Sequence, residues 1–272
     1  MTTNPPAPSS PSPPPSSPPA RLPVRRGLYE PVIGQLTYRA LLGRRRALLL
    51  AVVPALLLVL AVAIRRFGDL DAGQSMNLLD GFSLAIAVPL IALIAGTGAI
   101  GPEVDDGSII YLMAKPISRS LIASSKFLVA AAVTVVFGAG ATLVAGFIMA
   151  SGPDTMRVAV AMTVAALVAG LAYTALFLVL AVYTRAAVVV GLIYIVVWEG
   201  LLGGLVSGAQ RLSVHEWSLV VAERVLGSRA ADLGLRSDLS FTAAVVMITV
   251  VIVGGVALAG YRLRTARLTN DE

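Results

Sequence analysis

Residues 47–64 read ALLLAVVPALLLVLAVAI, an apolar run without a charged side chain. An α-helix needs about 20 mainly apolar residues to cross the roughly 30 Å hydrocarbon core of a bilayer, and this run approaches that length. Pro54 lies inside it, and a membrane-spanning helix accepts proline when neighbouring groups satisfy the freed carbonyl. The run therefore predicts a transmembrane helix.

Five further apolar runs follow along the chain. The 272 residues are 57% hydrophobic and 13% charged, whereas soluble domains are about 25% charged. We therefore predict an all-α integral membrane protein whose six transmembrane helices cover residues 47–64, 82–101, 127–150, 158–183, 187–206 and 240–261. The ends of the fourth and fifth helices stay open, because little more than Thr184 and Arg185 separates the two runs.

Two different segments precede the first run. Residues 1–27 are rich in proline and serine, a composition that buries little apolar surface, so we predict a disordered cytoplasmic tail. Residues 28–46 combine helical spacing of apolar side chains with the basic run from Arg44 to Arg46. This pattern predicts an N-terminal helix along the cytoplasmic interface, and we expect residues 28–272 to form one six-helix transmembrane domain.

The distribution of basic residues predicts the orientation. If the N-terminus is cytoplasmic, the inner connections carry 14 Lys and Arg and the outer ones carry seven. Because cytoplasmic loops are enriched in these residues, both termini are expected in the cytoplasm of a multi-pass protein of the plasma or inner membrane. The arginines flank apolar runs instead of forming one stripe, so we expect lipid and not nucleic acid as their partner.

The segment after the second run is the most informative connection. Pro102 is expected to end the membrane helix, and residues 103–114 to form a short separate helix. That helix has acids in its first turn, where the helix dipole favours them, an apolar middle, and Pro116 at its end. Such a helix is suited to docking into a groove of a cytoplasmic partner protein.

This segment resembles the signature of permease subunits of type-2 ABC exporters: a Glu, a Gly a few residues later, a Leu-containing turn, Pro-Ile-Ser-Arg and a later Lys. The resemblance implies a coupling helix that contacts a separate cytoplasmic ABC ATPase subunit. The residues that match the signature are Glu103, Gly107, Leu112, Pro116, Ser118, Arg119 and Lys126.

The chain is not expected to hydrolyse ATP itself. A phosphate-binding loop needs a Lys after Gly, and neither Lys115 nor Lys126 follows a glycine. We therefore expect no cofactor on this chain, with ATP and Mg²⁺ on the partner subunit. The lack of Cys and the presence of one His argue against a metal site. A half-transporter of six helices is expected to pair, as a homodimer or with a related permease, and the Ala-, Val- and Arg-rich composition suggests a bacterium.

Glu199 lies inside the fifth apolar run. A carboxylate at membrane depth is costly, so it is expected either to line the translocation pathway or an outer gate with Gly200 and Gly204, or to begin a wet stretch after the helix ends. The glycines also permit close helix packing. Further on, we expect His215 to be exposed and Trp217 to anchor a short helix at headgroup level.

Two other functions remain open. A secondary transporter is expected to have related halves with interrupted helices and several buried ionisable residues, but only Glu199 lies at depth. An integral membrane enzyme needs a constellation of catalytic groups, and the loop carboxylates form no such pair. The sequence does not select a substrate or settle whether transport is outward.

Overall fold

In the computed structural model, the structure describes residues 31–41, 43–68, 71–105, 119–202, 210–235, 237 and 239–265, and these contain helices and no strand. The α-helices are α1 (Pro31–Leu41), α2 (Arg44–Phe67), α3 (Ala72–Leu78), α4 (Val88–Asp105), α6 (Arg119–Thr134), α7 (Gly140–Met149), α8 (Pro153–Tyr183), α9 (Ala187–Ile193), α11 (Val214–Leu226) and α12 (Phe241–Thr265). Three segments are π-helical: η1 (Leu79–Ala87), η2 (Val135–Ala139) and η3 (Tyr194–Leu202). The first joins α3 to α4, the second joins α6 to α7, and the third extends α9. Short 3₁₀ turns, η4 (Gln210–Leu212) and η5 (Gly227–Arg229), flank α11.

Five helical stretches are long and apolar enough to cross a membrane: Ala47–Phe67, Ala72–Gly101, Arg119–Met149, Pro153–Tyr183 and Phe241–Leu263. They correspond to the first, second, third, fourth and sixth predicted helices, and several begin earlier than predicted. The fifth predicted helix corresponds to a shorter apolar helix, Ala187–Leu201. The all-α membrane architecture is therefore confirmed, while a sixth crossing stays a prediction.

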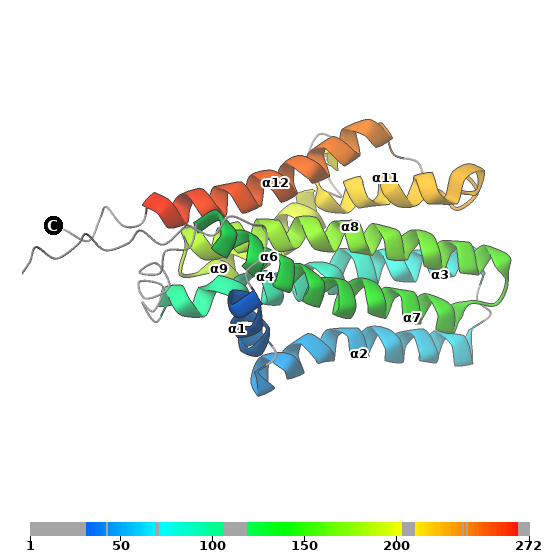
Figure 1. Ribbon diagram of the computed structural model, residues 1–272. Coiled ribbons are helices and arrows are strands. Elements are labelled where there is room, and N and C mark those ends of the chain that lie inside the picture. Colours follow the sequence, from blue (N-terminus) through cyan, green and yellow to red (C-terminus); the bar gives the residue numbers. More distant parts are fainter. Residues whose placement is uncertain are drawn as a thin grey trace, which may run out of the picture.

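The centre of the bundle is α8, which packs against α4, α7, α11 and α12 (Figure 1). Its buried face consists largely of alanines, with Gly170, Tyr173 and Phe177 among them. Small side chains allow neighbouring backbones to approach closely, which drives helix association where lipid removes the hydrophobic effect. A Cβ atom added at Gly96 of α4 would lie 3.0 Å from the Thr174 carbonyl oxygen of α8. The composition of α8 thus determines how tightly its neighbours pack.

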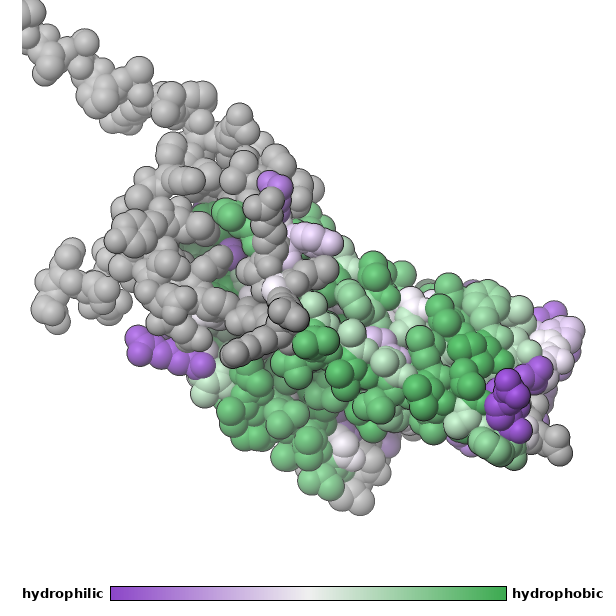
Figure 2. Space-filling view, turned by 90° about the horizontal axis from the view of Figure 1, so that it is seen from below, coloured by the Kyte–Doolittle hydropathy of each residue, from purple (hydrophilic) through white to green (hydrophobic). Residues whose placement is uncertain are grey.

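The outermost helices are α2 and α12, on opposite sides of α8 in Figure 1. In the most apolar 18-residue segment of each helix, 22% is buried in α2 and 11% in α12, against 61% in α8. Their exposed side chains include Leu56, Val59, Val250 and Val253. Figure 2 shows apolar side chains along the length of the bundle, with hydrophilic ones near its ends. This distribution is that of helices in contact with lipid.

The two ends of the bundle differ in charge. At the end where α1 lies, which we call the α1 end, the described side chains include the cations Arg119, Lys126, Arg185 and Arg262, and α4 ends there with Glu103 and Asp105. Seven further carboxylates lie at mid-bundle or toward the opposite end, which we call the α11 end: Asp71, Asp80, Asp154, Glu199, Glu216, Glu223 and Asp232. The α11 end also carries described arginines: Arg65, Arg66, Arg157, Arg211, Arg224 and Arg229.

Two expectations for helix ends are wrong. Pro102 does not end the α-helix, because α4 continues to Asp105, although the membrane-spanning stretch ends at Gly101 as predicted. A single proline removes only its own N–H from the helical ladder, and membrane helices accommodate such a loss. The predicted interfacial segment 28–46 is also not one helix, since α1 ends at Leu41 and Arg44 begins α2. The basic run from Arg44 to Arg46 therefore opens the first membrane helix.

Candidate functional site

Most of the predicted coupling segment lies outside the described residues. Glu103 lies in the last turn of α4, whereas Gly107, Leu112, Pro116 and Ser118 belong to the undescribed stretch 106–118, as does most of the predicted helix 103–114. Gly204 is also outside the described part of the chain. The structure describes the residues where this stretch leaves and re-enters the bundle, at the α1 end.

Arg119 links the re-entry point to the last transmembrane helix. It is the first residue of α6, and its guanidinium Nη1 donates a hydrogen bond to the Leu263 carbonyl oxygen at 2.8 Å. Leu263 lies in the last turn of α12, where carbonyl groups lack intrahelical partners and the helix dipole favours a cation. Arg119 therefore caps α12 from a helix that is far away in the sequence.

Lys126 is buried within the bundle, with 2% of its surface exposed. Its Nζ donates a hydrogen bond to the Ala99 carbonyl oxygen of α4 at 2.6 Å. A buried ammonium group requires such partners, because unpaired it would be strongly destabilising. Lys126 thus ties α4 to α6 below the undescribed stretch, and it is not placed to dock directly on another protein.

Glu199 accepts hydrogen bonds from three groups, two of them from the start of α11. Its Oε1 accepts from the Tyr194 hydroxyl at 2.9 Å and from the Val214 amide at 3.1 Å, and its Oε2 accepts from the Ser213 hydroxyl at 2.5 Å. Ser213 is the N-cap of α11 and accepts from the Glu216 amide. The carboxylate thus lies at the positive end of the α11 dipole, and it fastens η3 to α11.

A second link joins α11 to η1. The Nε2 atom of His215 lies 2.9 Å from Oδ1 of Asp80, and both side chains are partly buried. Burial lowers the pKa of His215, but Asp80, Glu199 and Glu216 raise it by more, so the net pKa is raised. Burial, followed by Asp80 and Glu199, also raises the pKa of Glu216. Since η1 contacts η3 as well, two π-helical segments and α11 form one polar junction.

Several members of this junction were not predicted from the sequence. Asp80 and Tyr194 lie at the edge or inside apolar runs, and Tyr173 is a fully buried residue of α8. The Tyr173 hydroxyl has no hydrogen-bond partner among the described residues, although it faces Glu199 and the His215 backbone. The sequence position of Asp80 could have indicated the junction, because an acid at the start of a membrane-spanning run requires a partner.

The expectations for His215 and Trp217 are wrong. His215 is partly buried and bonded to Asp80, and Trp217 is 5% exposed with its indole N–H donating to the Arg211 carbonyl oxygen. The short helix was predicted correctly, and α11 packs on α8. Gly200 is exposed, and a Cβ atom there would meet only the Ile195 carbonyl oxygen at 3.7 Å.

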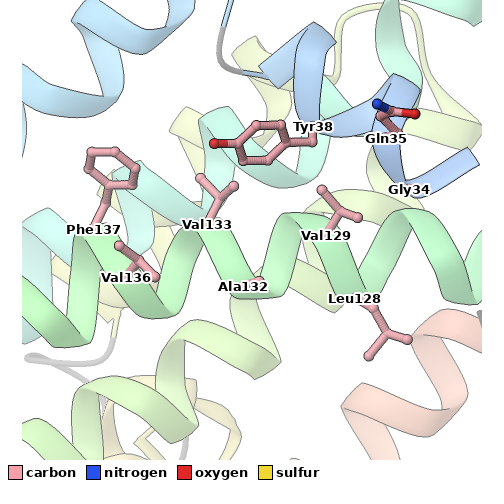
Figure 3. Close-up of a pocket in the computed structure, with 9 residues that line it drawn as sticks. All are labelled: Gly34, Gln35, Tyr38, Leu128, Val129, Ala132, Val133, Val136 and Phe137. Carbon is pink, nitrogen blue, oxygen red and sulfur yellow. The ribbon is translucent and has the colours of Figure 1, made fainter. Parts of the chain in front are cut away.

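Two hollows lie toward the α1 end. One, of about 640 Å³, is an apolar groove between α1 and the α6–η2 helix. In Figure 3 the Tyr38 ring of α1 extends over α6 near Val129 and Val133. The other, of about 240 Å³, lies between α2, α4 and the turn from α8 to α9, with Thr97, Gly101 and Arg185 in its lining.

The chain matches a known protein family. A family model described as ABC-2 family transporter protein matches residues 38–216, more than half of the chain. This range includes the segment around Glu103 and Arg119, the polar junction at Glu199, and the helices from α2 to η3. None of the curated proteins matches the sequence.

Proposed function

Because this chain belongs to the ABC-2 family of transporter proteins, we propose that it is the permease subunit of an ATP-driven exporter. In this proposal a separate cytoplasmic ABC ATPase binds ATP and Mg²⁺, hydrolyses the nucleotide and moves the permease between inward- and outward-facing states. The chain supplies the membrane pathway and no catalytic group. The observation that carries the proposal is the family match over a segment with the coupling signature, from Glu103 to Lys126.

The contacts of Arg119 and Lys126 support a coupling role for the segment between them and α4. A force on residues 106–118 reaches α4 and α6 through the backbone, and α12 through the Arg119–Leu263 hydrogen bond, while the Lys126–Ala99 hydrogen bond holds α4 and α6 together. Hydrogen bonds from charged donors are stronger than neutral ones, so both bonds help to keep the helices that they join in contact. Arg119 and Lys126, the last two signature residues, then act by connecting α6 to α12 and to α4.

The exposed apolar surface supports pairing with a second permease copy. One six-helix chain does not enclose a pathway, and α2 and the apolar helix Ala187–Leu201 expose large side chains such as Leu48, Val189 and Ile193. We propose a homodimer, or a heterodimer with a related permease, in the plasma membrane of a bacterium. Six crossings place both termini in the cytoplasm, with the ATPase at the α1 end.

The polar junction supports a gate at the opposite end of the pathway. Glu199 anchors α11 to η3, and His215 anchors it to Asp80 in η1. Rearrangement of these bonds would let α11 move relative to α8 while the membrane helices remain packed. We therefore assign Glu199 to an outer gate, as a residue that positions α11, with Gly200 beside it and Gly204 further along.

The proposal is tested by reconstituting the permease with its ATPase and measuring ATP hydrolysis with and without the permease. Glu103→Gln and Arg119→Gln are expected to reduce the permease-dependent part of the ATPase rate about tenfold, within the usual range of coupling energies. Arg157→Gln, an exposed position near the start of α8, is the control and should retain coupling.

Membrane insertion is checked for each variant by its yield after detergent extraction. Unchanged coupling in both variants at normal yield would contradict the role of the segment. Failure to recover any nucleotide-hydrolysing partner with the tagged wild-type permease would contradict the transporter assignment itself.

A further inference from the structure

The smaller hollow at the α1 end is a cavity with one polar corner and one apolar wall. Leu49, Ile94 and Val188 form much of the apolar side, whereas Thr97, Thr184 and Arg185 provide the polar groups. Gly101 leaves room in it, because a Cβ atom there would meet nothing within 4 Å. The volume of about 240 Å³ is suited to a small headgroup with the first part of a chain.

Arg185 differs from the other cations at this end of the bundle. Arg119 and Lys126 donate to backbone carbonyls, and Arg262 lies 5.1 Å from the centre of the Tyr183 ring. Arg185 makes no hydrogen bond or ion pair with any side chain that the structure describes, and the nearest acids in the chain at this end, Glu103 and Asp105, lie in the last turn of α4. A guanidinium in the lining of a cavity attracts an anion.

Thr184 provides a second donor beside Arg185. Its hydroxyl oxygen accepts a hydrogen bond from the Ala186 amide at 3.2 Å, so its proton remains available to an acceptor. A guanidinium and a hydroxyl in the lining of one cavity can both bind the oxygens of a phosphate or carboxylate. The opposite wall, with Leu49 57% exposed and Val188 56% exposed, offers only apolar contact.

We infer that this cavity binds the transported substrate at its entry point, and that the substrate is an anionic amphiphile: a phosphate or carboxylate headgroup on an apolar chain. The headgroup binds Arg185 and Thr184, and the chain lies against Leu49 and Val188. The inference rests on the proposed transport function, because it names the chemistry of the substrate. With the α1 end in the cytoplasm, as proposed above, the site would face the cytoplasmic side of the membrane.

Direct binding tests this inference without the ATPase. The full-length permease in phosphatidylcholine nanodiscs is dialysed to equilibrium against radiolabelled octyl phosphate, and binding to empty nanodiscs is subtracted. We expect saturable binding that weakens at least about tenfold in Arg185→Gln, because a charge-assisted hydrogen bond is lost. Gly101→Leu, which fills the cavity, should weaken it similarly.

Matched controls separate the site from general effects. Arg157→Gln removes an exposed arginine at the other end of α8, and Gly254→Leu adds a side chain to α12 where nothing lies within 4 Å; both should bind as the wild type does. Equal binding of octyl glucoside or octylammonium would overturn the anionic specificity. Equal binding of inorganic phosphate would overturn the need for a chain.

A bilayer lipid has the same chemistry, so the source of the ligand is tested separately. If phosphatidylglycerol in the nanodisc abolishes octyl phosphate binding, the site belongs to a membrane lipid and the substrate assignment is overturned. If Arg185→Gln binds normally, the cavity assignment is overturned. Neither result affects the ATPase-coupling measurement with Arg119→Gln, so the proposed function stands or falls independently.

Discussion

His215 shows how one side chain joins two parts of the fold. Its imidazole reaches Asp80, 135 positions earlier in the chain, and the charged form is favoured by three nearby carboxylates. Sequence patterns place His215 on a helix but do not reveal this partner, because the pairing depends on how α11 folds back onto the bundle. Glu199 was recognised because a carboxylate at membrane depth carries a high free-energy cost. The three groups that donate hydrogen bonds to it could not be predicted from the sequence either.

The raised pKa of His215 predicts a pH dependence of stability. A group whose pKa is higher in the folded state stabilises the fold fully below its unfolded value of about 6.5, and this contribution is lost as the pH rises through the folded value. Thermal unfolding of the purified permease should therefore show His215→Gln most destabilised, by about 1–3 kcal/mol, below pH 6.5.

The difference between the wild type and His215→Gln should shrink as the pH rises above 6.5 toward 9. The pKa of Glu216 is also raised, so its contribution to stability is likewise lost as the pH rises. That loss begins at the ordinary pKa of a carboxyl group, below that of His215, so Glu216→Gln serves as the comparison variant at lower pH. A difference between wild type and His215→Gln that is constant from pH 6 to 9 would show that the Asp80–His215 contact is not ionic.

At the level of helices, the sequence predicted which stretches are helical better than where they begin and end. Apolar runs are detected by length alone, but the helices extend beyond them into polar residues such as Arg119 and Ser120. The π-helical segments were not predicted, because the extra residue that each contains has no signature in an apolar run. These segments carry Asp80 and Glu199, so the polar junction escaped prediction with them.

The contact between α7 and α8 predicts a steric effect at Gly146. A Cβ atom there would lie 2.5 Å from the Ala159 Cβ and 3.0 Å from its Cα, so the two backbones must separate. Gly146→Ala should destabilise the protein by about 1–3 kcal/mol, even though alanine improves helix propensity by about 1 kcal/mol. The measurement is the midpoint of thermal unfolding in nanodiscs.

Gly254→Ala is the matched control for this contact. The same added methyl group in α12 meets nothing within 4 Å, so only the gain in helix propensity remains and stability should be unchanged or slightly higher. A Gly146→Ala variant as stable as Gly254→Ala would mean that α7 and α8 do not pack this closely.

For the whole molecule, composition alone was sufficient to predict a bundle of lipid-exposed helices, and the coupling signature predicted the family. Neither could show that Lys126 is buried, since a lysine beside a charged loop is usually solvated. The number of crossings depends on residues 203–209, which lie outside the described chain.

The absence of cysteine from the sequence allows the orientation to be tested with single cysteines. Gly152→Cys, between α7 and α8, should react with a membrane-impermeant maleimide in intact cells. Ser120→Cys, near the start of α6, should react only after the cells are permeabilised. Both positions are exposed, so accessibility alone does not separate them, and the reverse pattern would invert the predicted topology.

The concentration of described cations at the α1 end also has an electrical consequence. A bacterial membrane is negative inside, and moving one elementary charge through 100 mV corresponds to about 2.3 kcal/mol. The four described cations and the carboxylates of Glu103 and Asp105 leave a surplus of two positive charges at that end, which would gain about 5 kcal/mol from facing inward, before any contact with lipid or ATPase. The resting voltage therefore favours the orientation in which the α1 end faces the cytoplasm. Cells without a membrane potential should insert a larger share of the permease in the opposite orientation.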